Sequence, residues 1–366
     1  MFRYQRTMEM LWAGLLNSFK QQRRSLKTSS VYQTRQLKCL YSLKQRGILN
    51  KVFPPIEDLQ LPSLIRQSQS VYCGFDPTSD SLHLGNLLPM ILLLHLQKEG
   101  LTPIVVVGDA TAKVGDPSGR LTERSTMEQD IIENNSKGLE KNIRTVFDNY
   151  KRYFHYGNFL PNLQLVRNSY WYLDQTLDSF VGTVERHFRL SKMLNRESVR
   201  QRLNSPGGMS VTEFSYQIFQ AYDWLRLYEM YTCCVQIGGQ DQMGNIESGH
   251  DLIKRTHGEN CYGFMTPIIT TVTGEKFGKS VGNAIWLSPT KTSPQDLYNF
   301  LLQRSDTEAV QLVQLFTFLN DEELRKLLCA HRDCPKKKLC QKKLASDVTT
   351  LVHGEEGLSL ALTSGK

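Results

Sequence analysis

Two short apolar runs separated by a helical segment constrain the fold of this chain more than any other feature. VYCGF (71–75) reads as a strand, and PIVVVGD (103–109) is a continuous β-branched run, as in fully buried parallel strands. Between them, LLPMILLLHLQKEG (87–100) has the length of a helix and closes on Gly100. Strand, helix and strand within about forty residues form a parallel βαβ unit. The sequence therefore predicts an α/β fold built on a parallel sheet.

The same alternation continues along the chain. Further helices are predicted over 123–150, 172–204, 212–231 and 241–258. Further strands are predicted at CCVQIGG (233–239) and PIITTV (267–272). From residue 292 onward the sequence indicates only short helices. We therefore expect a Rossmann-like, doubly wound parallel sheet domain followed by a small all-α domain.

The positive charge is concentrated at the N-terminus. The formal net charge is +8, but residues 1–56 hold eleven Lys and Arg against the single acid Glu9, so they carry +10 and the rest carries −2. A basic, Ser-rich, acid-poor leader is typical of a mitochondrial transit peptide. A basic arm that contacts RNA is the alternative. We expect targeting to the mitochondrial matrix.

The sequence gives no sign of a membrane segment or of a protein-bound metal. No apolar run approaches the length of about 18 residues that a membrane helix needs. The eight cysteines show neither disulfide nor zinc spacing. Cys329, His331, Cys334 and Cys340 could in principle supply metal ligands, but they contain no C-x-x-C pair. We expect free thiols in a reducing compartment and no metal bound by the protein itself.

HLGN (83–86) stands where a turn passes into an apolar helix. Gly85 would let a phosphate approach the free N–H groups of a helix N-terminus, and His83 and Asn86 would add side-chain donors. A structural histidine at an ordinary helix start is the alternative. The pattern by itself leaves both interpretations open.

TGEKFGKSVGN (273–283) is close to the P-loop pattern but departs from it twice. Thr273 stands where the first glycine is required, and VGNAIWL after Ser280 does not read as the helix that a P-loop opens. Lys276 and Lys279 on a glycine-containing loop favour a mobile clamp for a polyanion. A solvated basic turn is the alternative.

Two further stretches bring polar groups into apolar surroundings. In VQIGGQDQMGN (235–245), Asp241 and Gln242 follow a strand at the carboxyl end of the sheet, where an Asp commonly binds a ribose or, alternatively, only caps a helix. In YQIFQAYD (216–223), Tyr216, Gln220 and Asp223 share one helical face. A solvent-facing stripe is possible, but the aromatic neighbours favour burial and hence a need for partners.

Taken in order, YCGFDPT, HLGN, GDPSGR, YQIFQAYD, VQIGGQDQMGN and KFGKS resemble the motifs of bacterial-type tyrosyl-tRNA synthetases. The resemblance covers residues from about 71 to about 358, with HLGN in place of the class I HIGH motif and KFGKS in place of KMSKS. It implies that tyrosine and ATP react to give tyrosyl-adenylate, which is transferred to tRNA(Tyr). It also implies Mg²⁺ accompanying ATP and a homodimer, with residues 187–203 expected near the interface.

Carried over position by position, the resemblance implies these site residues. The tyrosine would be held by Tyr72, Asp116, Asn168, Tyr216, Gln220, Asp223 and Gln242. ATP would be bound by Cys73, Asp76, Thr78, His83, Gly85, Asn86, Gly239, Asp241, Lys276, Lys279 and Ser280. The catalytic residues would be His83, Asn86, Arg120, Arg124, Lys276 and Lys279. Tyr72 and Asp223 are expected at the phenol hydroxyl, and Asp116 and Gln220 at the ammonium group.

The sequence departs from the family pattern at two positions. Asn86 replaces the second His of the motif, but an asparagine can still donate an N–H to a ribose oxygen. Tryptophanyl-tRNA synthetases also carry Asn there, so this position does not decide the amino acid. Gln240 replaces a residue that is usually small, and nothing in the sequence explains it.

The expected domains follow from the motifs. They are a transit-like segment (1–50), a catalytic domain (51–285) with a helical insertion at about 150–210 and the KFGKS loop at 276–280, and a helical domain (286–358). No S4-like RNA-binding module is expected after it, so we expect weak tRNA charging. The alternatives are tryptophan activation, a catalytically inactive RNA-binding protein and, more remotely, a P-loop NTPase.

Overall fold

The computed structural model describes residues 30–57, 68–120, 122–157, 159–269, 279–280 and 283–363. For residues 30–37, 279, 280 and 283 it describes the backbone only. Lys276 therefore lies outside the described residues, as do the side chains of Lys279 and Ser280.

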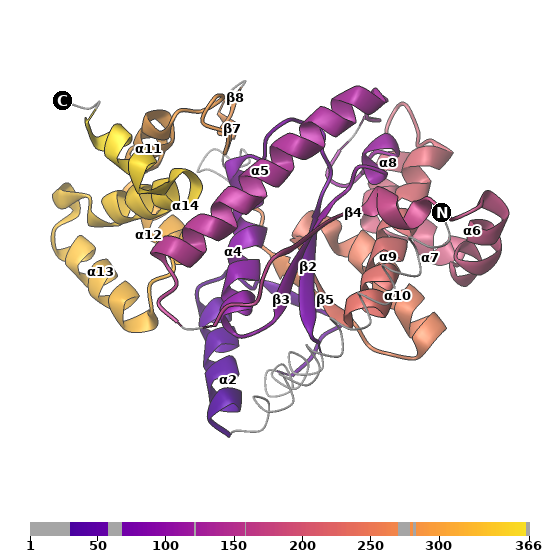
Figure 1. Cartoon of the computed structure of the whole chain (residues 1–366), viewed down its shortest axis with the longest axis horizontal. Helices are drawn as coiled ribbons and strands as arrows, with labels where there is room; N and C mark the ends of the chain where they lie inside the picture. The colour runs from indigo at the N-terminus through magenta and orange to yellow at the C-terminus, as the bar shows by residue number, and fades with distance from the viewer. Residues whose placement is uncertain are drawn as a thin grey trace, which may run out of the picture.

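A six-stranded sheet forms the centre of the molecule (Figure 1). Its strands are β1 (Lys51–Phe53), β2 (Ser70–Phe75), β3 (Thr102–Val107), β4 (Gln164–Arg167), β5 (Cys233–Gly239) and β6 (Tyr262–Thr266). They lie in the order β1-β6-β5-β2-β3-β4, and only β1 is antiparallel to its neighbour. After β1, which lies at one edge, the chain forms β2 in the middle, adds β3 and β4 on one side of it and then returns to add β5 and β6 on the other. This reversal between β2 and β5 is the switch point at which doubly wound sheets bind ligands.

Helices cover both faces of the sheet (Figure 1). On one face lie α4 (Leu84–Lys98) and α5 (Gln129–Tyr153), and on the other lie α9 (Val211–Tyr231) and α10 (Met243–His257). Buried side chains form one cluster on each side of the sheet. The Rossmann-like, doubly wound prediction is confirmed in its architecture.

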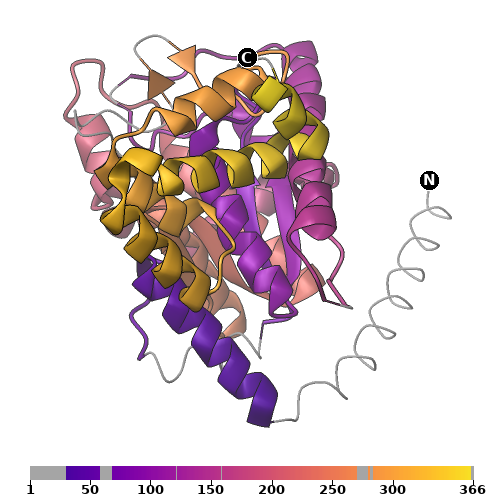
Figure 2. The ribbon, with the colours of Figure 1, turned by 90° about the vertical axis from the view of Figure 1, so that its left-hand side faces the viewer.

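The C-terminal part is all helical among the residues described after Trp286. It consists of α11 (Pro294–Leu302), α12 (Asp306–Phe316), α13 (Asp321–Asp333) and α14 (Leu339–Thr363), which is interrupted by non-helical backbone at Gly354. Figure 2 shows these helices in front of α4. Buried residues of α11, α12 and α14 belong to the same core cluster as those of α4 and α5, so the helical part packs on the sheet domain.

An N-terminal helix, α2 (Ser30–Gln45), joins this body. Leu40, Leu43, Ile48 and Leu49 are buried in the main core cluster. Arg46 donates from Nε to Gln314 O and from Nη1 to Leu319 O, both at 2.8 Å. The expected boundary of the basic leader at residue 50 thus falls inside the folded body, because apolar residues within the basic stretch have a core to enter.

The strand predictions need correction near the edges of the sheet. The predicted strand at 267–272 is wrong for residues 267–269, and residues 270–272 lie outside the described chain. The strand is β6 instead, which pairs with β5 from Tyr262 to Thr266 and ends before Pro267, a residue without an N–H for the ladder. Strand β1, of three residues, was not predicted.

The helical insertion begins later than expected. Strand β4 falls within 150–210 and pairs with β3, so the insertion consists of the short helices after it. These are the 3₁₀ segments Asn168–Tyr172 and Glu185–His187, α6 (Leu177–Thr183), α7 (Leu190–Leu194) and α8 (Glu197–Leu203). Strand β4 has only four residues, and all four are half-buried. So short a stretch shows no periodicity that would distinguish a strand from a helix in the sequence. The two-residue strands β7 (Lys279–Ser280) and β8 (Asn283–Ala284) pair near the KFGKS loop.

Candidate active site

A pocket of about 890 Å³ opens at the carboxyl ends of β2 and β5. It brings together most of the predicted site residues: Tyr72, Cys73, Asp76, Thr78, His83, Gly85, Asn86, Asp116, Arg120, Arg124, Tyr216, Gln220, Asp223, Gly239, Asp241 and Gln242. These residues come from segments up to 170 positions apart. Only the parallel arrangement of the strands makes them neighbours.

At the buried end of the pocket, Asp223 on α9 carries three side-chain donors. Its Oδ1 accepts from Trp171 Nε1 at 2.8 Å and from Tyr172 Oη at 3.0 Å, and its Oδ2 accepts from Asn168 Nδ2 at 3.0 Å. Burial nevertheless raises the pKa of Asp223 to about 7, although the three donors oppose the shift. The carboxylate therefore titrates close to neutral pH.

Tyr72 from β2 lines the same pocket. Burial raises the pKa of its phenol well above the usual value, and the nearby Asp223 carboxylate raises it further. The Tyr72 hydroxyl is buried and has no hydrogen-bond partner among the described residues. Because buried hydroxyls are normally satisfied, this group is available to a ligand that enters the pocket.

Asn168 is the one predicted residue that the structure describes outside the pocket lining. It lies behind Asp223, is fully buried, and accepts from the Ala110 N–H at 2.8 Å. Its amide nitrogen donates to Asp223, which does line the pocket, and its contact with a tyrosine stays a prediction.

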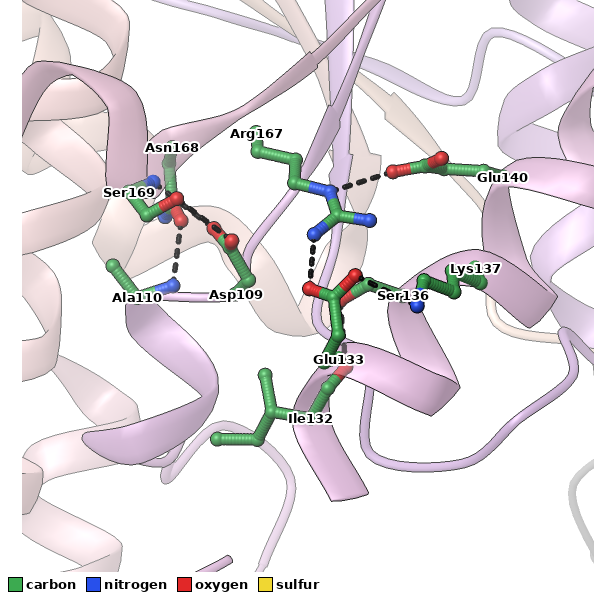
Figure 3. Close-up of polar contacts among 10 residues, drawn as sticks. All are labelled: Asp109, Ala110, Ile132, Glu133, Ser136, Lys137, Glu140, Arg167, Asn168 and Ser169. Carbon is green, nitrogen blue, oxygen red and sulfur yellow. Dashed lines mark hydrogen bonds and ion pairs between the residues drawn. The ribbon is translucent and has the colours of Figure 1, made fainter. Parts of the chain in front are cut away.

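The chain is fixed on either side of Asn168 (Figure 3). Arg167 donates to Glu133 and, at 2.7 Å, to Glu140, both on α5. Ser169 donates from its backbone and its hydroxyl to the two oxygens of Asp109, at 3.0 and 2.7 Å. The end of β4 is thus held at three successive residues, which positions the groups that contact Asp223.

A second buried carboxylate, Asp76, lies beyond the end of β2. It accepts from Thr111 Oγ1 at 2.7 Å and from Tyr216 Oη at 2.8 Å, and burial raises its pKa to about 6. A Cβ on Gly108 would lie 2.1 Å from Asp76 Oδ1 and 2.3 Å from Thr111 Oγ1. Only glycine leaves room for this pair.

Asp116 organises a third polar group. Its Oδ2 accepts from Gln242 Nε2 at 2.8 Å, and its Oδ1 accepts from the Ser118 N–H at 3.0 Å. Asn245 Nδ2 donates to Gln242 Oε1 at 3.0 Å. Gln242 is therefore already oriented by its neighbours.

HLGN both starts α4 and lines the pocket, so its two interpretations are compatible. His83 Nδ1 accepts from the Gly85 N–H at 3.1 Å, and Asn86 Oδ1 accepts from the His83 N–H at 3.0 Å, which forms a capping box. Asn142 on α5 holds the preceding turn through the Leu82 N–H at 3.0 Å. Because the Asn86 carbonyl is used in the cap, its Nδ2 remains as the donor to a ligand.

The arginines lie toward the outer part of the pocket. The Arg120 side chain is largely exposed, and the partial desolvation of its guanidinium, together with the charge of neighbouring Arg124, lowers its pKa. Arg124 donates from Nε to the Asp116 carbonyl at 3.2 Å. Two cations that line the same pocket suit an anion.

Sequence reasoning missed several residues of this site. Trp171, Tyr172 and Thr111 act on Asp223 or Asp76 but lie outside the motifs. Gln236 also lines the pocket, and its buried Oε1 has no partner among the described residues. A glutamine in the apolar strand CCVQIGG was a usable signal, because a buried amide needs partners.

Among the described residues, no group of three or more His, Cys, Asp and Glu could hold a metal ion. Nor is any helix in the described ranges long and apolar enough to cross a membrane.

Residues 66–363 match the family described as tRNA synthetases class I (W and Y). This match spans most of the chain, which therefore belongs to that family. Similar relatives are mitochondrial tyrosine–tRNA ligases. That of Drosophila melanogaster is 47% identical over 330 residues, covering 88% of this chain and 71% of that protein. That of Homo sapiens is 43% identical over 328 residues, covering 88% and 69%.

Solved structures give the same family. A C-terminally truncated mitochondrial tyrosyl-tRNA synthetase of Coccidioides posadasii superposes with a TM-score of 0.80 at 28% identity, covering 94% of this chain and 99% of that one. A tryptophanyl-tRNA synthetase of Giardia lamblia, at 17% identity and a TM-score of 0.60, shares the fold.

Proposed function

We propose that this chain is a mitochondrial tyrosine–tRNA ligase, which activates L-tyrosine with ATP and transfers it to tRNA(Tyr). The observation that carries the proposal is the buried end of the pocket, where the Tyr72 hydroxyl lacks a partner and lies within electrostatic reach of Asp223. A phenol hydroxyl both donates and accepts a hydrogen bond, so it satisfies both groups. An indole N–H only donates, which disfavours tryptophan because a buried group would stay unsatisfied.

The other groups follow the length of the substrate. Asp116, Gln220 and Gln242 would bind the ammonium end of the tyrosine, and Tyr216 would line the pocket beside them. Asn168 would hold Asp223, and its contact with the tyrosine itself stays a prediction.

ATP would lie over the carboxyl ends of β2 and β5. Cys73, Gly239 and Asp241 would contact its ribose. The phosphate-side residues would be Asp76, Thr78, His83, Gly85, Asn86, Arg120, Arg124, Lys276, Lys279 and Ser280. The last three rest on the KFGKS motif and the family match alone. Mg²⁺ would arrive with the phosphates, and no step is derived through it.

The chemistry needs positioning and charge stabilisation rather than a covalent nucleophile. The tyrosine carboxylate attacks the α-phosphorus in line, the bond to the bridging oxygen breaks, and pyrophosphate leaves with the electron pair. His83 and the basic side chains stabilise the charge that develops on the leaving group. A ribose hydroxyl at the tRNA 3′ end then attacks the adenylate carbonyl, and AMP leaves.

The test is ATP–pyrophosphate exchange with tyrosine, tryptophan and phenylalanine in turn. We expect exchange with tyrosine only. Asp223→Ala should lose tyrosine-dependent exchange, because removing a charged partner from a buried hydroxyl costs at least about 1–3 kcal/mol. The matched control is Asp148→Ala, an exposed aspartate on α5. Tryptophan-dependent exchange, or normal tyrosine exchange by Asp223→Ala, would contradict the proposal.

Lys276→Ala and Lys279→Ala test the KFGKS loop. Contacts that strengthen only in the transition state affect the rate and not the ground state. We expect slower adenylate formation with an almost unchanged tyrosine Kd. A raised Kd at an unchanged rate would refute this role.

We also propose a homodimer formed through the insertion. Exposed apolar side chains recur in the segment from residue 173 to 211, which includes the expected interface at 187–203: Leu173, Leu177, Val181, Leu190, Leu194, Leu203 and Val211. Burial of such side chains against a second copy would stabilise a dimer. Leu177→Asp should shift the chain from dimer to monomer in sedimentation, whereas Leu360→Asp, at an exposed leucine of α14, should not. A monomer before substitution would contradict the proposal.

For tRNA, the basic stretch at residues 336–343 is the proposed phosphate contact. Lys336, Lys337, Lys338 and Lys342 are exposed there. Replacing them with glutamine should weaken tRNA charging and its salt dependence while leaving exchange unchanged.

A further inference from the structure

The turn that carries His83 is joined to the segment that follows the KFGKS region. The Leu84 N–H donates to Ile285 O and the Leu287 N–H donates to Leu82 O, both at 2.8 Å. His83 and Trp286 form an antiparallel bridge between these bonds. The two backbones are therefore fixed against each other.

The two side chains at this bridge are also in contact. The His83 and Trp286 ring centroids lie 6.3 Å apart at 64°, in an edge-on arrangement, and both residues line the pocket. His83 Nδ1 accepts the Gly85 N–H, so in the neutral ring the proton is on Nε2. The cap and the indole together limit how the imidazole can turn.

The indole is itself held by a cation. Lys291 Nζ lies 4.7 Å from the centroid of the Trp286 ring, within cation–π range, and also forms an ion pair with Asp80. The hydrogen bond from Lys291 lowers the pKa of Asp80, so the Asp80 carboxylate stays charged at neutral pH. Asp80 lies three residues before His83 in the chain, so the contacts His83–Trp286, Trp286–Lys291 and Lys291–Asp80 form a circuit that is closed through the backbone from Asp80 to His83.

We propose that Trp286 is a positioning residue for His83 and that Lys291 and Asp80 hold its indole in place. The inference rests on the proposed function, in which His83 acts at the phosphates of ATP. Small misplacements of a group in the transition state slow a reaction strongly, so the circuit affects rate more than substrate affinity. Lys291 does not line the pocket, so its effect on the reaction passes through Trp286.

The first test separates rate from binding. Trp286→Leu should slow the maximal rate of exchange about tenfold and leave the tyrosine Kd unchanged. Trp286→Phe keeps an aromatic edge and should recover most of the rate, and Lys291→Met should show a smaller loss. The control is Lys326→Met, which removes an exposed lysine paired with Glu322 and should change nothing. Equal losses in Trp286→Leu and Trp286→Phe would overturn the proposal.

The second test is a double-mutant cycle. In a His83→Ala background, Trp286→Leu should lower the rate no further. An equal loss in both backgrounds would overturn the proposal, because Trp286 would then act on ATP directly. The ratios are taken with whichever amino acid supports exchange, so failure with tyrosine counts only against the proposed function.

The contact between the Trp286 and His83 rings can also be measured by NMR, independently of catalysis. The ring current of the indole should shift the imidazole proton resonances of His83, identified by their loss in His83→Ala. Trp286→Leu and Lys291→Met should move these resonances and Lys326→Met should not. Unmoved resonances in Trp286→Leu would count against the proposal.

Discussion

Individual residues in this site are held by neighbours that lie far away in the sequence. Asp223 is the clearest case, because a carboxylate with three donors still has a pKa raised to about 7. The donors come from the 3₁₀ segment after β4, whereas Tyr72 comes from β2. The effect of burial on the pKa of Asp223 is larger than the opposing effect of the three hydrogen bonds. The surroundings of the carboxylate therefore bring its protonation close to neutral pH.

The first prediction concerns the pH dependence of tyrosine binding. A raised pKa means that the ionised fraction of Asp223 falls as the pH drops through about 7. In the proposed complex the ionised carboxylate accepts a hydrogen bond from the phenol hydroxyl of the substrate. The tyrosine Kd should therefore rise by up to about tenfold when the pH is lowered from 8 to 6. Calorimetric titration at several pH values measures this.

The variant Asp223→Asn provides the control. It should bind tyrosine weakly and with a flatter pH profile, the remaining slope coming from Asp76, whose pKa is raised to about 6. A pH-independent Kd in the unmodified chain would be evidence against the assignment.

The second prediction concerns Gly108→Ala. Its Cβ would push apart the hydrogen-bonded pair Asp76 and Thr111, so we expect a loss of about 1–3 kcal/mol in unfolding free energy together with reduced exchange. Gly182→Ala in α6 is the matched control, since nothing lies within 4 Å of its Cβ position. Denaturant unfolding measures the stability of both variants. Equal unfolding free energies for Gly108→Ala and Gly182→Ala would contradict the prediction, because Asp76 would then move aside without cost.

At the scale of elements, a buried ion pair and a helix cap connect helices that are not held together by strand pairing. Helix α8 is attached to the start of α9 by Arg202, which donates from Nε and Nη2 to Glu213 at 3.0 Å each. Glu213 also completes the capping box of α9 with Ser210. The same helix carries Tyr216 and Asp223, so the insertion and the site share a support.

The third prediction is that Arg202→Met destabilises the chain by about 3–5 kcal/mol, because it leaves the buried Glu213 carboxylate without its cation. Both side chains are at most 4% exposed. Adding Glu213→Gln should recover part of the loss. Lys326→Met, in a pair that is at least 69% exposed, should cost about 0–1 kcal/mol. Similar losses in the two single variants would contradict the buried-pair argument.

At the scale of the whole molecule, the N-terminal and C-terminal helices hold each other. Arg46 donates to three carbonyls in the last turn of α12 and in the loop that leads to α13, including that of Thr317. Burial lowers its pKa to about 10, so it remains a cation at neutral pH. Satisfying the carbonyls at the end of α12 is a structural role that a cleaved leader could not fulfil.

The fourth prediction concerns truncation. A chain that begins at Ser30 retains α2 and the buried Leu40, Leu43 and Leu49, and its melting temperature is the reference for a shorter chain. A chain that begins at Lys51 loses Leu40, Leu43 and Leu49, each worth about 1.5–3 kcal/mol when buried, and should not fold stably.

Arg46→Met in the full chain tests the same contact without truncation, and should lower the unfolding free energy by about 3 kcal/mol. Import of a fusion of residues 1–56 with a reporter then shows where a leader is removed, and we expect cleavage before α2. Cleavage after residue 50 with retained stability would refute this.

Much of the fold was predictable because its signals are local. Strands β2, β3 and β5 are short continuous apolar runs, and α9 and α10 are long enough for their caps and periodicity to be read. Strands β1 and β4 have three and four residues and half-exposed patterns, so only pairing in the sheet defines them. Strand β6 was misplaced because the apolar residues after Pro267 resemble a strand better than YGFMT does.

The sequence by itself determined the doubly wound class and identified most of the residues that line the pocket, since spacing and residue type are local properties. The tertiary structure alone decided that Asn168 stands behind Asp223, that Gln236 reaches the pocket, that Trp286 contacts His83 and that α2 belongs to the body. Each depends on which distant segments a twisted sheet brings together at its carboxyl edge, and long-range packing of that kind leaves no periodic trace in the chain.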